Sequence, residues 1–202
     1  MVFSTIHKLF TVLLLMLALN ANATLIDFEG AIGSAHNIGD SLDVGDYRFT
    51  LSDDITSGFI SFTKKNFIIA PNTTKLIVAN HSELTMSRID GAAFNLHSLD
   101  IAGTFALSPG RWADHVDLIA GDDVFTANLA GAPANYQNIS PGFNDITSVI
   151  FSPFGNINGF DVNYEFVIDN VSVTEASVPE PSTAWLLCFG LALFSLAKWK
   201  VR

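Results

Sequence analysis

Short runs in which hydrophobic and polar residues alternate recur along most of the chain, and the period of an amphipathic helix is nearly absent between them. The clearest run is 47–51, where Tyr47, Phe49 and Leu51 fall on one face of a predicted strand. About ten short strands without crossover helices predict an all-β domain, a single sandwich of two packed sheets. The other expected strands are 25–29, 59–62, 66–70, 76–79, 83–86, 94–101, 116–120, 124–129, 146–151 and 165–173.

Local signals add detail to this sandwich. Gly121-Asp122-Asp123 separates two strands and predicts a hairpin, because Gly and Asp tolerate the conformations of tight turns. A second hairpin is expected across 80–82, and a loop from 30 to 46. In 94–101 the apolar face slips by one residue, which predicts a β-bulge at His97-Ser98.

The N-terminal segment, residues 1–23, has the pattern of a secretory signal peptide. An apolar stretch from Leu9 to Leu19 is followed by Ala21-Asn22-Ala23, a small-x-small cleavage pattern. Cleavage after Ala23 would leave Thr24 as the mature N-terminus. The alternative, an uncleaved anchor, fits less well because the apolar stretch is short.

Residues 184–197 form a second apolar segment, which carries no charge and is followed by Lys198, Lys200 and Arg202. With Trp185 and Trp199 at the interfaces, this segment predicts one thin transmembrane helix whose basic end stays in the cytoplasm. A buried amphipathic helix is the alternative. Apolar residues surround the segment rather than following one face, which argues against it.

The order of features in the tail is specific: Val178-Pro179-Glu180-Pro181, then the apolar segment, then the basic end. This arrangement resembles the PEP-CTERM sorting signal of exopolysaccharide-producing Gram-negative bacteria. The resemblance implies recognition and cleavage by an exosortase, with the helix a transient anchor in the inner membrane and the cell surface or extracellular matrix as destination. The chain then divides into a signal peptide (1–23), a β-sandwich ectodomain (24–177) and a sorting signal (178–202).

The body of the chain is strongly acidic. Four of the ten Lys and Arg lie in the two targeting segments, and all twenty Asp and Glu lie between 24 and 181, so the six remaining basic residues leave a net charge of −14. Such a charge disfavours nucleic acid as a partner. The single cysteine, Cys188, lies in the apolar tail, so the body is expected to fold without a disulfide.

Three segments of the body also resemble ectodomains that carry PEP-CTERM tails: 25–30, 94–101 and 166–173. The first and last resemble the edge motifs of jelly-roll carbohydrate-binding modules, which implies a jelly-roll-like fold. In such modules acids of the first and last strands share a structural calcium ion, and the matching residues here are Asp27, Glu29 and Asp169. Two or three carboxylates with carbonyls and water suit calcium. Alternatively, Asp169 and Asn170 simply form a bulge or turn and face solvent.

Glycan binding usually needs an exposed aromatic platform beside hydrogen-bonding groups. The candidates are Trp112 and Tyr136, both expected in loops. Either could equally close the end of the sandwich as a core residue.

No catalytic signature is present: there is no Gly-x-Ser-x-Gly elbow, no nucleotide-binding loop and no pair of histidines at metal-ligand spacing. The sequence therefore favours a non-enzymatic surface or matrix protein associated with exopolysaccharide. No cofactor is required, and the structural calcium ion is the one candidate. A carbohydrate-binding module for a specific glycan is the alternative. A polysaccharide hydrolase comes third, because no pair of acids has a spacing that sets two carboxylates at catalytic separation.

Overall fold

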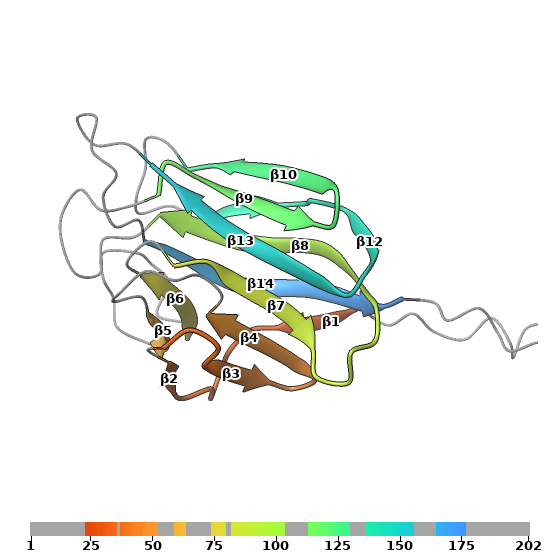
Figure 1. Cartoon of the computed structure of the whole chain (residues 1–202), viewed down its shortest axis with the longest axis horizontal. Coiled ribbons are helices and arrows are strands. Elements are labelled where there is room, and N and C mark those ends of the chain that lie inside the picture. Colours follow the sequence, from red (N-terminus) through yellow and green to blue (C-terminus); the bar gives the residue numbers. More distant parts are fainter. Residues whose placement is uncertain are drawn as a thin grey trace, which may run out of the picture.

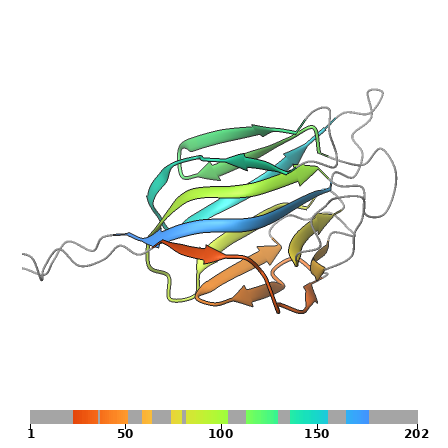
Figure 2. The same cartoon turned by 180° about the vertical axis from the view of Figure 1, so that it is seen from behind.

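Two antiparallel sheets packed face to face make up the body of the protein (Figures 1 and 2). The computed structural model describes residues 23–35, 37–51, 59–63, 74–79, 82–103, 113–129, 136–155 and 165–176. Sheet A contains β1 (Thr24–Ile26), β2 (Ser34–Ala35), β5 (Phe59–Thr63), β6 (Lys75–Ala79), β8 (Phe94–Gly103), β11 (Gln137–Ile139), β12 (Phe143–Ile146) and β14 (Phe166–Glu175). Sheet B contains β3 (Ser41–Val44), β4 (Tyr47–Leu51), β7 (Leu84–Arg88), β9 (His115–Ala120), β10 (Asp123–Asn128) and β13 (Ser148–Phe154).

The strand order shows how distant parts of the chain meet. Sheet A runs β11-β8-β14-β6-β5-β2, with β1 also paired to β14 and β12 also paired to β8. Sheet B runs β10-β9-β13-β7-β4-β3. The first and last described strands are therefore neighbours, with Ile26 opposite Val171. The two-sheet, all-β sandwich predicted from the sequence is confirmed.

Alternation along the strands builds the core between the sheets. In β4 the residues Tyr47, Phe49 and Leu51 are buried, and the edge-to-face contact between Tyr47 and Phe94 joins sheet B to sheet A at a centroid distance of 5.5 Å. A smaller apolar cluster lies on the other face of sheet A. It consists of Ile77, Ala79, Ala102 and Val167, with Tyr136 packed against it.

Two predictions of local structure, a hairpin and a β-bulge, are confirmed. The hairpin is confirmed as β9 and β10, with Asp123 opposite Ala120 and Gly121 at a φ of +62° in the turn. The bulge is confirmed too, because Ser98 lies opposite Ser172 while Leu96 lies opposite the very next residue, Val173. His97 is the extra residue.

Three other predictions are wrong, wholly or in part. The strands 76–79 and 83–86 do not form a hairpin, because β6 belongs to sheet A and β7 to sheet B. The segment 30–46 is not only a loop, since it contributes β2 and β3 to different sheets. The predicted strand 25–29 ends earlier, at Ile26, because Phe28 has a φ of 56°. The predicted strand 66–70 lies outside the described residues.

Candidate functional site

The carboxylates predicted to hold calcium lie where the first strand meets the last. Asp27 Oδ1 accepts a hydrogen bond of 3.0 Å from the Glu29 backbone N–H, which shapes the turn after β1. Glu29 accepts bonds from Thr74, at 2.9 Å from its backbone N–H and at 3.2 Å from its hydroxyl. Asp169 is buried in β14, and its Oδ1 accepts the N–H of Asn170 at 2.8 Å.

A buried lysine lies beside one of the predicted calcium ligands. Lys75 is only 2% exposed and begins β6, one residue beyond the Leu76–Ile168 pair, so it neighbours Asp169. Burial lowers the pKa of Lys75, while the negative charge of Asp169 acts in the opposite direction. In the described part of the chain no three His, Cys, Asp or Glu side chains are grouped so that they could hold a metal ion.

The bulge in β14 organises a polar network around Asp100. Asn170 has a left-handed φ of 49°, and its side-chain amide donates to Asp100 Oδ2 at 2.8 Å. Asn138 of β11 donates to Asp100 Oδ1, also at 2.8 Å. The alternative expected from the sequence, a bulge at Asp169 and Asn170, is therefore present. Asp169 is nevertheless buried rather than exposed to solvent.

Of the two predicted glycan platforms, Tyr136 can be placed. Its half-buried ring lies on the small apolar cluster of sheet A, and its hydroxyl is buried without a hydrogen-bond partner among the described residues. Burial raises the pKa of Tyr136, and the negative charges of Asp169 and Asp100 raise it further. Trp112 lies outside the described residues.

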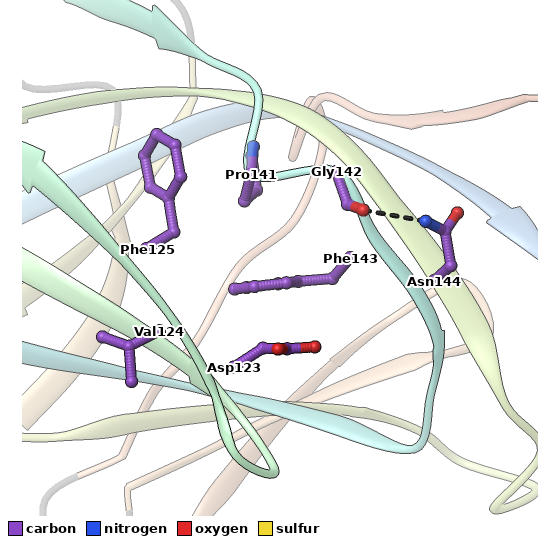
Figure 3. Close-up of a pocket in the computed structure, with 7 residues that line it drawn as sticks. All are labelled: Asp123, Val124, Phe125, Pro141, Gly142, Phe143 and Asn144. Atoms are coloured by element: carbon purple, nitrogen blue, oxygen red, sulfur yellow. Dashed lines mark hydrogen bonds between the residues drawn. The ribbon is translucent and has the colours of Figure 1, made fainter.

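A groove that the sequence did not reveal lies at one edge of the sandwich, where β10 of sheet B approaches the β11–β12 segment of sheet A (Figure 3). It has a volume of about 340 Å³. Its lining residues are Asp123, Val124, Phe125, Pro141, Gly142, Phe143 and Asn144.

Alternation along β10 places its side chains. Ala127 is buried in the core and Phe125 packs against that core while remaining half-buried, so Phe125 and Asp123 face the interior side of the strand. Phe143 comes from the opposite sheet and is 7% exposed, closing the core. The edge position of β10 in sheet B leaves the Phe125 ring partly accessible.

Irregular backbone shapes the opposite wall of the groove. Gly142 has a φ of +68° and Asp145 one of 56°, and the register of β12 against β8 shifts between Phe143 and Ile146. The side-chain amide of Asn144 donates to the Gly142 carbonyl at 2.9 Å, which orients Asn144 at the rim (Figure 3). Asp123 and Asn144 are both exposed, so polar side chains border the groove beside the half-buried ring of Phe125 and the buried ring of Phe143.

The predicted targeting segments lie almost entirely outside the described residues. Ala21 and the sorting residues Val178, Pro179, Glu180 and Pro181 fall outside the described residues, as does the expected transmembrane helix. Ala23 and Thr24 are described and exposed, at the start of β1. Among the described residues there is no helix long and apolar enough to cross a membrane.

Comparison with known proteins bears mainly on the tail. Residues 177–202 match the family described as the PEP-CTERM protein-sorting motif. No curated protein matches the chain. Among solved structures, the fold is similar to a cleaved adhesin domain of Lys-gingipain from Porphyromonas gingivalis, with 10% sequence identity, coverage of 77% of this chain and 99% of that chain, and a TM-score of 0.48.

Proposed function

We propose that this chain, which carries a PEP-CTERM sorting motif, is an exported, non-enzymatic surface or matrix protein that an exosortase releases into exopolysaccharide. The motif at 177–202 is the observation that carries the proposal, because it implies export and exosortase processing. Its residues Val178, Pro179, Glu180 and Pro181 are the recognition sequence in this proposal. The apolar segment that follows holds the chain in the inner membrane until cleavage.

The other end of the chain fits the same route. A signal peptide over 1–23, cut after Ala23, would deliver the body across the inner membrane with Thr24 at its N-terminus. The ectodomain, residues 24–177, would then reach the surface as part of the released product. Thr24 is exposed at the start of β1, which is compatible with a free mature N-terminus there.

Features of the body support a binding role over catalysis. The polar groups around Asp100 are engaged with one another: both carboxylate oxygens of Asp100 accept amide hydrogens. These bonds join Asp100 of β8 to Asn138 of β11 and Asn170 of β14, so the carboxylate has a structural role in sheet A. The edge groove, with polar side chains beside two phenylalanine rings, is instead suited to holding a ligand.

Intact mass spectrometry of the surface-exposed protein tests the proposed route. The expected mature species begins at Thr24 and lacks the segment from Leu186 onward. Glu180→Gln should leave an uncut, membrane-bound form. Glu175→Gln is the matched control, since it neutralises a nearby acid that lies before the motif and should be processed normally. A wild-type surface protein that retains 186–202 would contradict the proposal and indicate a permanent anchor.

A further inference from the structure

We infer that the edge groove between β10 and β12 is a binding site for one neutral pyranose unit of a saccharide. This inference deepens the proposed function and rests on it, because retention in exopolysaccharide requires a contact between the body and sugar. The lining residues of the groove include neither Asp100 nor Tyr136, so the groove is distinct from the polar network and from the described platform residue.

The aromatic part of the groove suits the C–H face of a sugar ring. Phe125 remains half-buried on an edge strand, while Phe143 is buried and forms a floor anchored in the core. Pro141, also half-buried, lines the side opposite β10. Figure 3 shows the two phenylalanine rings and the proline ring arranged around the same space. An apolar sugar face packs on such rings, as aromatic side chains do in ligand sites generally.

The polar rim supplies hydrogen-bond acceptors for sugar hydroxyls. Asp123 presents an exposed carboxylate, which accepts hydrogen bonds and donates none when ionised. Asn144 uses its amide nitrogen on the Gly142 carbonyl, and Figure 3 shows its side-chain oxygen on the side away from the phenylalanine rings, so Asp123 is the acceptor nearest to a bound sugar. Hydroxyls bonded to a charged acceptor form the stronger class of hydrogen bond.

Size and charge narrow the ligand further. Small-molecule sites commonly occupy about 300–1,000 Å³. The groove's 340 Å³ therefore suits one sugar ring with its substituents. Asp123 and the net charge of −14 repel carboxylate-bearing sugars, which favours neutral hexoses over uronic acids.

Saturation-transfer NMR on the full chain tests the inference, in a detergent without sugar headgroups. The probes are the methyl glycosides of glucose, galactose and mannose, each paired with the corresponding uronic acid. We expect at least one neutral glycoside to bind with a Kd of about 1 mM, and its uronic acid about tenfold more weakly. No saturation transfer to any neutral glycoside would overturn the inference.

Variants locate the binding. Phe125→Leu keeps an apolar side chain against the core but removes the ring, and should weaken the neutral glycoside about tenfold. Phe154→Leu is the matched control: it is an exposed phenylalanine on β13 outside the groove, and its loss should leave binding unchanged. Asp123→Asn, at an exposed position that folding tolerates, should narrow the preference for neutral over acidic sugar severalfold. Unchanged affinity in Phe125→Leu and an unchanged preference in Asp123→Asn would place the sugar elsewhere.

These outcomes are separable from those of the sorting proposal. The NMR experiment reports on the folded body whether or not the tail is cut. Normal processing without sugar binding would therefore remove only the groove inference, while sugar binding together with a wild-type surface protein that retains residues 186–202 would remove only the sorting proposal.

Discussion

Tyr136 offers the sharpest test of how the outer face of sheet A is built. Its hydroxyl is buried yet has no hydrogen-bond partner in the described part of the chain, while its ring packs on Ile77, Ala79, Ala102 and Val167. Tyr136→Phe removes the hydroxyl and keeps the ring. We therefore expect the variant to be more stable than the wild type.

The size of the gain follows from the cost of an unmade hydrogen bond. A buried polar group without a partner costs about 1–3 kcal/mol of desolvation. In a domain of this length each kcal/mol shifts the melting temperature by about 2–4 °C. Tyr136→Phe should thus raise the melting temperature by at least about 2 °C.

Tyr47→Phe is the matched control, because the same atom is removed from a tyrosine that has a partner. Tyr47 is 4% exposed and its hydroxyl interacts with the Arg88 side chain, which acts against the effect of burial on the pKa of Tyr47. Losing that interaction should cost about 0.5–1.5 kcal/mol, so the two variants should move in opposite directions. The assay is thermal unfolding of the full chain in detergent, followed by near-ultraviolet circular dichroism.

The pH dependence of stability tests the burial of the Tyr136 hydroxyl independently. Burial raises the pKa of Tyr136 in the folded state above the ordinary value of 10.0, with the charges of Asp169 and Asp100 adding to the effect. A raised pKa contributes stability that is present below pH 10 and declines as the pH rises beyond it. Tyr136→Phe should therefore lose stability less steeply above pH 10. A variant that melts below the wild type would show that the hydroxyl has a partner after all, and would refute the reasoning.

Further predictions concern stability in acid, packing of the core and calcium binding. Hydrogen bonds from Arg88 and from a backbone N–H lower the pKa of Asp90 from 3.8 to about 2, so part of the stability present above pH 3.8 should be lost as the pH falls toward 2, and Asp90→Asn should flatten that loss in an acid titration followed by circular dichroism. Phe94→Ala, at a fully buried position, should cost about 3–5 kcal/mol in chemical denaturation. A structural calcium ion at Glu29 and Asp169 would give the chain a higher melting temperature in millimolar calcium than in EDTA, and Glu29→Gln would abolish the difference. Equal melting temperatures would contradict the calcium site and leave Lys75 as the positive charge beside Asp169.

The parts of the fold that could be predicted from the sequence are those determined by residues close together in the chain. The hairpin of β9 and β10 depends on Gly121-Asp122, which lie between its own strands, and the bulge at His97 shows itself as a slip in a local period. Alternation in β4 likewise identifies Phe49 and Leu51 as core without knowledge of their partners. Each of these signals is complete within about ten residues.

The parts that escaped prediction depend on pairing between distant segments. A strand–turn–strand pattern at 76–86 looks the same whether the strands pair or cross to opposite sheets, and here they cross. The burial of Lys75 beside Asp169 joins residues 94 positions apart, and nothing near Lys75 in the sequence marks it as buried. The groove has the same origin, because Phe125 and Phe143 belong to edge strands of different sheets.

The position of β14 connects the fold to the fate of the tail. This strand pairs with β8, β6 and β1, so it is held within sheet A rather than at an edge. Its ladder with β8 extends to Glu175, opposite Phe94, and the Ala176 N–H still donates to the Ala93 carbonyl at 3.2 Å. The matched sorting motif begins at the next residue, 177. A cut within or after Pro179-Glu180-Pro181 would consequently leave the described hydrogen bonds of β14 intact, and the sandwich that holds the edge groove would need no rearrangement on release.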